Sequence, residues 1–307
     1  MAFQTTLQTM IVFFLILAVG FAAGKLNVIR KEYMGNFAAL ITKIFLPVMI
    51  FYFTASTVSL DLLISNLWLI PAAIATYAVL LLAAFLVAKA LRLPHDKDRI
   101  FQFAFIFGNT GFVGFPLLSA VFPATGMLFM CLFNIVDQII FWTYGIWLST
   151  ARDRTKGKFN IKMLISPNII AILLSVVFVI SGLPLPGILE TTLSTISKGT
   201  SPLCMMYLGA TICFSPMKAV LKRPDAYVYI AMKMVVLPIV AGAIANALSL
   251  PSEIVGCIVL FIALPVMTVV PMIAGQNSEE GPYATGIAVL SFVACLVTIP
   301  LVAFVAL

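Results

Sequence analysis

The sequence predicts an all-α polytopic membrane protein with ten transmembrane helices. We expect these helices to form two inverted five-helix repeats in which broken helices 4 and 9 cross. Three observations predict this fold: the composition, the spacing of the apolar runs, and helix-breaking residues at matched positions in the two halves. Of 307 residues, 63% are hydrophobic and 9% are charged. In soluble domains, roughly a quarter of all residues are charged. So few charges cannot cover a water-exposed surface, so lipid is the expected solvent.

The apolar runs give the expected helices in order, since about 20 residues are needed to cross the hydrocarbon core. The first run is interpreted as a span and not as a signal peptide, because Lys25, Arg30 and Lys31 follow it instead of preceding it. The ten expected spans lie near residues 8–24, 35–57, 66–90, 100–122, 125–149, 161–182, 192–214, 226–248, 253–275 and 281–305.

The basic residues predict the orientation. They gather in the connections after odd-numbered spans, whereas Asp61, Glu190 and Glu253 lie in the connections after even-numbered spans. The positive-inside rule therefore predicts a multi-pass protein of the cytoplasmic membrane with both termini outside. The net charge of +7 is explained by these loops, and we expect no nucleic-acid partner. The basic residues concerned are Lys25, Arg30, Lys31, Arg92, Lys97, Arg99, Arg152, Arg154, Lys156, Lys158, Lys218, Lys222 and Arg223.

The chain divides at its midpoint. We predict a first five-helix repeat over residues 1–150, a cytoplasmic linker over 151–160, and a second repeat over 161–307. A shift of 155 residues aligns Pro47 with Pro202 and Pro116 with Pro271. An odd number of spans in each half inverts one half relative to the other. This is the plan of many secondary transporters, whose sites lie near the midplane where broken helices meet.

The expected fourth and ninth spans carry the helix breakers. In the fourth, "FGNTGFVGFPLL" contains Gly108, Gly111, Gly114 and Pro116, which weaken a helix. A break at membrane depth requires surrounding protein or a watery cavity. Asn109 and Thr110 are available there to satisfy freed backbone groups or to hold a ligand.

The ninth span contains "ALPVMTVVPMIAGQ", with Thr268 between Pro265 and Pro271, and Gln276 following. Two crossing broken helices would direct their partially positive N-termini at one point, which favours an anion. The alternative is a pair of proline-kinked helices without a ligand. The candidate substrate-binding residues are Asn109, Thr110, Gly111, Pro116, Pro265, Thr268, Pro271 and Gln276.

At these residues the chain resembles the auxin efflux carrier family, which includes plant PIN-formed carriers and bacterial permeases. The motif N-T-x3-G-x-P-L-L, from Asn109 to Leu118, is similar to the family's fourth-helix signature, and "VVPMIAG" to its ninth-helix segment. "SPNIIAILLSVVFVISGLPLP" and "SPLCMMYLGATI" resemble its sixth and seventh helices. The plant carriers have P-x4-P in helix 9, whereas this chain has P-x5-P. That difference leaves open whether Pro265 or Pro271 marks the crossing, although the repeat offset favours Pro271 as the partner of Pro116.

The resemblance implies a fold related to bile-acid symporters and NhaA-type antiporters. Helices 1, 2, 6 and 7 would form a dimerising scaffold, and helices 3–5 and 8–10 a transport domain that moves like an elevator. The implied substrates are small organic anions, either auxin-like or mono- and dicarboxylates such as lactate, malate and malonate. The implied partners are therefore this substrate, the lipid bilayer and a second copy of the chain.

Charged residues inside the spans form a second group of candidates. Asp137 is the acidic residue well inside a span, with Asn134 and Gln138 within about one turn. These three residues are predicted to form either a proton or cation coupling site or a structural cluster. Lys43 and Lys198 are repeat mates that are available to attract an anion, although snorkelling explains them as well, and it is the expected role of Lys233.

Common catalytic and nucleotide-binding motifs are absent from the sequence. No Walker A, HExxH or GxSxG motif occurs, and His95 is the single histidine. We therefore expect no enzyme activity, no cofactor and no metal site. A cation-coupled symporter of another organic acid, a channel and a sensor remain alternatives. Sodium coupling would need oxygen ligands from Asn109, Thr110, Thr268 and Gln276, whereas protons through Asp137, or the membrane potential alone, fit at least as well.

Overall fold

The computed structural model describes residues 2–94, 96–150, 167–215 and 222–306, and the expected linker over 151–160 lies outside them. Within the described ranges the chain is helical. Its one β-type pairing there is an isolated antiparallel bridge between Gly108 and Val266. The all-α prediction is thus confirmed for these residues.

The first half of the chain forms long helices that are interrupted by short turns of altered pitch. Its α-helices are α1 (Ala2–Lys25), α2 (Met34–Leu40), α3 (Leu46–Thr57), α4 (Leu60–Ser65), α5 (Leu69–Leu91), α6 (Lys97–Ile106), α7 (Phe115–Val121), α8 (Pro123–Ile140) and α9 (Ile146–Ser149). A 3₁₀ turn, η1 (Lys31–Tyr33), precedes α2. The π-helical turns are η2 (Ile41–Phe45), η3 (Thr110–Gly114) and η4 (Phe141–Gly145).

The second half also consists of helices that are interrupted by short turns. Its α-helices are α10 (Pro167–Ser181), α11 (Gly187–Cys213), α13 (Pro224–Tyr229), α14 (Leu237–Ala247), α15 (Ser252–Ile262), α16 (Val269–Asn277) and α17 (Gly281–Ala306). A π-helical turn, η6 (Ile230–Val236), joins α13 to α14. The expected fourth and ninth spans are therefore not single helices, because each is divided into two shorter pieces.

Six helical segments are long and apolar enough to cross a membrane, by length and composition. They are Phe3–Lys25, Lys31–Thr57, Leu69–Leu91, Pro123–Ser149, Pro224–Ala247 and Gly281–Ala306. Three shorter apolar helices, Thr110–Val121, Pro167–Ser181 and Ser252–Ile262, accompany them. Large apolar side chains such as Leu15, Leu82 and Val177 point outward. An apolar exterior of this kind is expected where lipid is the solvent, so the chain is a multi-pass membrane protein.

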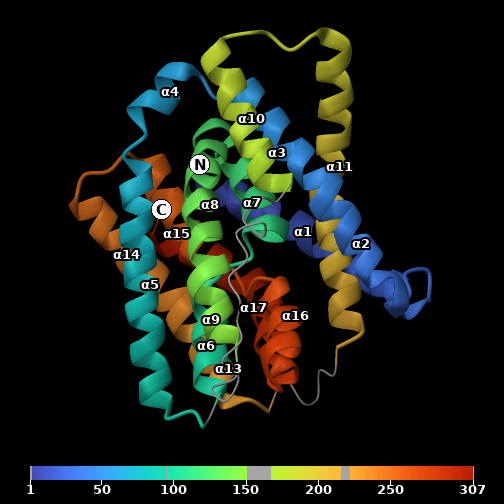
Figure 1. Cartoon of the computed structure of the whole chain (residues 1–307), viewed down its shortest axis with the longest axis vertical. Helices are drawn as coiled ribbons and strands as arrows, with labels where there is room; N and C mark the ends of the chain where they lie inside the picture. Colours follow the sequence, from blue (N-terminus) through green and yellow to red (C-terminus); the bar gives the residue numbers. More distant parts are fainter. Residues whose placement is uncertain (1, 95, 151–166, 216–221, 307) are drawn as a thin grey trace.

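Two sets of helices differ in how deeply they are buried. Helices α6, α8, α15 and α17 are buried over much of their surface, whereas α1 and α5 keep wide apolar faces outside. In Figure 1, α5 and α14 lie along one edge of the molecule and α11 along the other. Helix α4 and the α10–α11 turn lie at one end of the long axis, and the α5–α6 turn and α13 at the opposite end.

Helices α1 and α11 pack against each other along much of their length, and α3 packs against α10. The α1–α11 contact is close because glycines face backbone atoms. A Cβ at Gly20 would lie 2.2 Å from the Met206 carbonyl oxygen, and one at Gly209 would lie 2.0 Å from that of Leu17. The two chain termini also meet, since the rings of Phe3 and Phe304 are 5.3 Å apart.

Candidate functional site

The breaks in the two divided segments meet inside the molecule. Helix α6 ends at Ile106 and the next helical turn begins at Thr110, while α15 ends at Ile262 and α16 begins at Val269. The unwound stretches run antiparallel to each other. The Asn109 amide donates to the Pro265 carbonyl over 2.7 Å, and the Met267 amide donates to the Phe107 carbonyl over 3.0 Å. We call this contact the crossing.

The local sequence explains why the backbones approach so closely. A Cβ at Gly108 would lie 3.0 Å from the Leu264 Cβ, so a side chain there would push the two stretches apart. Pro265 has no amide hydrogen and contributes its carbonyl to the pairing. The amide of Val266 is satisfied from a third element, because it donates to the Ser291 hydroxyl of α17 over 3.1 Å. The proline at the crossing is thus Pro265, whereas Pro116 and Pro271 lie in the first turns of α7 and α16.

Asn109 is the polar residue at the start of the helix that follows the break after α6, which we call the outgoing helix. Its side-chain Oδ1 accepts from the Phe112 amide over 3.1 Å, which caps the helix Thr110–Val121. Its Nδ2 is buried and has no hydrogen-bond partner among the described residues. An unpaired buried amide costs about 1–3 kcal/mol. A free donor therefore lies beside the partially positive end of a helix, which is a favourable position for an anionic oxygen.

The other predicted residues divide into near and distant groups. Thr110 and Gly111 are in the first turn after the break, and Thr268 immediately precedes α16. Gln276 does not join them, because it lies in the last turn of α16, at the end opposite the break. The 155-residue offset could not predict the distant position of Gln276. It matches positions along the two halves of the sequence and gives no distance between residues in space.

Asp137 lies in α8 and is fully buried. Its carboxylate accepts from the Tyr77 hydroxyl of α5 and, over 3.4 Å, from the Gln138 amide group. Trp142 Nε1 in turn donates to Gln138 Oε1 over 3.0 Å. Asn134 is buried nearby in α8, but its Oδ1 has no hydrogen-bond partner among the described residues. The predicted cluster therefore forms in part, and it gains Tyr77, which no pattern in the apolar α5 sequence distinguished.

Lys233 does not snorkel. It lies in η6, is 1% exposed, and its Nζ donates to the Ile262 carbonyl over 2.6 Å. Ile262 is the last residue of α15, so the ammonium meets the C-terminal end of a broken helix. The snorkelling expectation is wrong here because the helix end offers the charge a carbonyl partner inside the protein, where carbonyl oxygens are otherwise unsatisfied.

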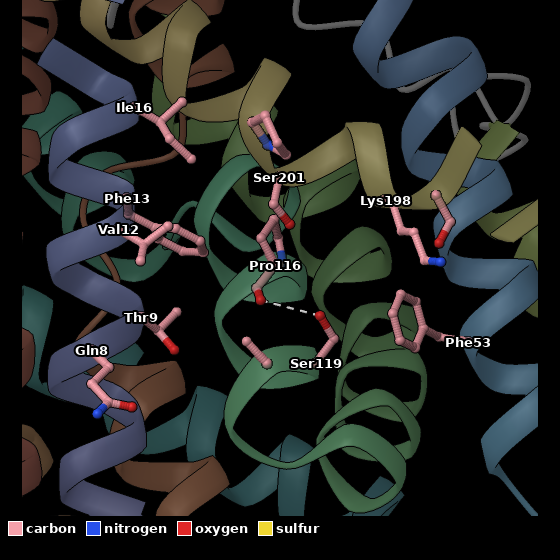
Figure 2. Close-up of a pocket in the computed structure, with 13 residues that line it drawn as sticks. Gln8, Thr9, Val12, Phe13, Ile16, Phe53, Pro116, Ser119, Lys198 and Ser201 are labelled. Carbon is pink, nitrogen blue, oxygen red and sulfur yellow. Dashed lines mark hydrogen bonds between the residues drawn. The ribbon is translucent and has the colours of Figure 1, made fainter. Parts of the chain in front are cut away.

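A cavity of about 430 Å³ lies beside the outgoing helix α7, between α1, α3 and α11. Figure 2 shows Pro116 and Ser119 of α7 facing Lys198 and Ser201 of α11, with Gln8 and Thr9 on the α1 side. Ser197 also lines it, and its buried hydroxyl has no partner among the described residues. The other walls are apolar, so the cavity combines a polar side with an apolar one. Lys43 does not line this cavity; it is exposed, in η2.

The fold and the crossing define a class of protein, the multi-pass membrane transporters with discontinuous helices. The family model described as "Membrane transport protein" matches residues 5–156 and 151–303. The chain therefore belongs to this family of membrane transport proteins, and the expected relation to the auxin efflux carriers is confirmed.

Two curated relatives are similar to the chain. One, from Methanothermobacter thermautotrophicus, bears the name "Uncharacterized transporter"; it is 24% identical over 303 residues, 98% of either chain. The other, also an uncharacterized transporter, comes from Methanocaldococcus jannaschii. It is 25% identical over 215 residues, which cover 67% of this chain and 68% of the relative. Both names agree with the family of membrane transport proteins to which the chain belongs.

Proposed function

We propose that this protein is a secondary carrier that moves a small organic anion across the cytoplasmic membrane by an elevator-type mechanism. The observation that carries the proposal is the unpaired, buried Asn109 Nδ2 at the crossing. An amide donor beside a helix N-terminus binds a carboxylate oxygen without a full countercharge, so the anion can both enter and leave.

The packing supports two inverted repeats. Under the 155-residue offset, helix 1 corresponds to helix 6 and helix 2 to helix 7. The contact of α1 with α11 then has its counterpart in the contact of α10 with α3. The Thr200 hydroxyl donates to the Phe45 carbonyl over 3.1 Å, and these residues are 155 positions apart. A residue that touches its own repeat mate lies near the axis relating the two halves.

This arrangement supports the proposed division into scaffold and transport domain. Helices α1, α2, α3, α10 and α11 form the proposed scaffold, and α5–α9 with α13–α17 form the proposed transport domain. The cavity beside α7 lies between these groups, so it is the proposed route from the crossing to one side of the membrane. Lys198 would attract the anion there, and we assign a lesser role to Lys43 because it lies outside the cavity.

We also propose an orientation in the membrane and a homodimeric assembly. The contact between Phe3 and Phe304 supports termini on one side, which we assign to the outside. Arg92 follows α5 and Arg223 precedes α13. The α5–α6 turn and α13 lie at one end of the molecule (Figure 1), which supports a cytoplasmic location for that end. We assign the outer faces of the scaffold to a homodimer.

Uptake by the purified protein in liposomes tests the function. Labelled indole-3-acetate, lactate, malate and malonate are offered outside, with unlabelled anion trapped inside to drive counterflow. At least one anion should accumulate saturably. Unitary currents in electrical recordings would instead identify a channel. Absence of any anion flux through folded protein would contradict the proposal.

Two substitutions locate the site. Asn109→Ala should abolish uptake because it removes both the cap and the free donor. Asn109→Asp retains the capping oxygen but replaces the donor with an acceptor, so it should also abolish uptake while preserving the fold. Asn66→Ala is the matched control, because Asn66 lies after α4 and its Nδ2 already donates to the Leu62 carbonyl over 2.8 Å. Wild-type uptake by Asn109→Asp would remove Asn109 from the site.

A further inference from the structure

A second polar atom near the crossing has no partner. Asn134 of α8 is 3% exposed, and its Oδ1 accepts no hydrogen bond from the described residues. The large majority of buried acceptors in proteins are paired, and an unpaired one destabilises the folded state. The hydrogen bonds that hold Asp137 and Gln138, close by in the same helix, do not include Asn134. Packing alone therefore does not explain this side chain.

Contacts of α8 with the chain around the break after α6 place Asn134. Met130, Asn134 and Phe141 follow one another at intervals of four and seven residues, so they share one face of the helix. A Cβ at Gly114, after the break, would lie 3.0 Å from Met130 Cε. The ring centroids of Phe107, before the break, and Phe141 are 5.0 Å apart. Asn134 therefore lies between these two contacts, opposite the break itself.

The two asparagines, Asn109 in the break and Asn134 in α8, belong to facing stretches of chain. Their free atoms are of opposite kinds. The Nδ2 of Asn109 is a donor, because Oδ1 caps the following helix, whereas the free atom of Asn134 is an acceptor. Neither atom satisfies the other. A bound molecule that accepts from Asn109 and donates to Asn134 would satisfy both.

The same face of α8 borders the proposed scaffold. Cys131, three residues before Asn134, has its Sγ 3.2 Å from the Oγ1 of Thr54 in α3. The cavity of about 430 Å³ lies between the same two groups of helices. Asn134 therefore lies near the boundary along which the substrate of the proposed carrier would enter.

The free donor and the free acceptor together select among small carboxylates. An ionised carboxylate has acceptor oxygens only, which suit Asn109 Nδ2, whereas a hydroxyl on the neighbouring carbon supplies an O–H donor for Asn134 Oδ1. Propionate lacks this donor, and malonate presents a second carboxylate whose oxygens would face an acceptor. A site whose polar groups pair with a substrate hydroxyl rejects an analogue without it, because its own groups are then left unpaired.

We propose that Asn134 is a specificity-determining residue that accepts a hydrogen bond from a hydroxyl next to the substrate carboxylate. The carrier then prefers 2-hydroxy acids, of which lactate is the simplest probe, to propionate and malonate. The proposal rests on the proposed carrier function and names the substrate class of the same site. Asn109 binds the carboxylate, and Asn134 distinguishes the hydroxy acid from its analogues.

Dissociation constants of the purified full chain in detergent test this preference. Both enantiomers of lactate, propionate and malonate are titrated separately at neutral pH, where the carboxyl groups are ionised. Binding is followed by the rise in unfolding temperature, since a ligand of the folded state stabilises it. The better-bound enantiomer of lactate should bind about tenfold more tightly than propionate or malonate. Equal constants for lactate and propionate would overturn the proposal.

Substitution of Asn134 provides the second arm. Asn134→Ala should weaken lactate binding to the level of propionate while changing propionate binding little. A purely structural role would instead weaken both ligands equally, and that result would contradict the proposal. Asn66→Ala is the matched control and should keep the preference for lactate, because Asn66 already donates to the Leu62 carbonyl. If Asn134→Ala did not fold, Asn134→Leu, which has a similar shape and no acceptor, would replace it with the same expected result.

Two further outcomes separate this proposal from the proposed function. Suppose that indole-3-acetate binds more tightly than lactate and loses this advantage in Asn134→Ala. The donor is then the ring N–H, so the hydroxy-acid preference is wrong while the carrier is preserved. Equal binding and uptake of lactate and propionate have the same consequence. Absence of binding and uptake of every acid by folded protein contradicts the carrier, and the role of Asn134 with it.

Discussion

The polar side chains around the crossing differ in whether the protein itself satisfies them. Asn109 has one engaged oxygen and one free donor, whereas Asp137 is hydrogen-bonded to Tyr77 and Gln138. Lys233 is bonded to Ile262. Asn109 therefore offers a free donor, which we propose binds the substrate, while the other two side chains are already held by the protein. We therefore propose a binding role for Asn109 and a structural role for Asp137 and Lys233.

Replacement of Tyr77 by phenylalanine tests the support given to Asp137. Tyr77→Phe removes the hydroxyl that donates to the buried carboxylate, and a hydrogen bond to a charged group is worth about 1.5–3 kcal/mol. We expect a loss of that size in the free energy of unfolding, measured by denaturant titration. Tyr52→Phe is the control, because Tyr52 is only half-buried. An equal loss in both variants would show that the hydroxyl does not stabilise Asp137.

Asp137→Asn tests coupling to protons. The asparagine keeps the size of the side chain but cannot titrate, so uptake by the variant should become independent of pH if Asp137 carries the coupled proton. Uptake measured over a range of external pH gives the two profiles. A variant profile with the wild-type shape would leave Asp137 a structural role only.

The sequence predicted part of this site. Asn109, Thr110 and Asp137 stand out because each is a polar residue within an apolar run. Tyr77 and Lys233 could not be assigned in this way. Tyrosine is common in apolar helices, and a lysine two turns from a membrane surface normally snorkels. Their roles depend on which helix end or carboxylate lies opposite, and that is a property of tertiary packing.

At the level of elements, glycine and proline predicted both broken helices. The residues of the crossing were harder to predict, because the offset aligned Pro116 with Pro271, and these lie in the first turns of α7 and α16. The backbone pairing instead uses Pro265, which faces Asn109. Pairing between two unwound stretches depends on where each helix stops, and helix ends are the least certain feature of a sequence-based prediction.

Helix packing gives a prediction at the same scale. Gly209→Ala places a Cβ 2.0 Å from the Leu17 carbonyl oxygen, so α1 and α11 must separate. Overpacking of this kind typically costs about 1–3 kcal/mol. The unfolding temperature should fall clearly below that of the wild type. Gly35→Ala is the matched control, since nothing lies within 4 Å of its Cβ position. Equal temperatures for the two variants would contradict the close contact.

At the scale of the whole molecule, the elevator proposal requires the transport domain to slide past the scaffold. Thr54 of α3 and Cys131 of α8 belong to the two different groups, and their Oγ1 and Sγ atoms are 3.2 Å apart. Thr54→Cys should therefore form a disulfide with Cys131 after small adjustments. Oxidation with a membrane-permeant reagent should stop uptake, and a reductant should restore it.

A disulfide inside the scaffold is the control for that experiment. A Cβ at Gly24 of α1 would lie 3.1 Å from the Cys213 Cβ of α11, so Gly24→Cys should also cross-link. This bond joins two helices that the proposal keeps together, and uptake should continue. Undiminished uptake by fully cross-linked Thr54→Cys protein would contradict the elevator movement.

Equilibrium binding of a labelled carboxylate to the purified protein tests whether the crossing holds the anion. The carboxylate with the highest uptake is titrated against the wild type, Asn109→Asp and Asn66→Ala. Loss of a hydrogen bond to a charged group predicts a dissociation constant about tenfold to a hundredfold weaker for Asn109→Asp. Asn66→Ala should bind as the wild type does. Unchanged affinity in folded Asn109→Asp would show that the anion does not bind at the crossing.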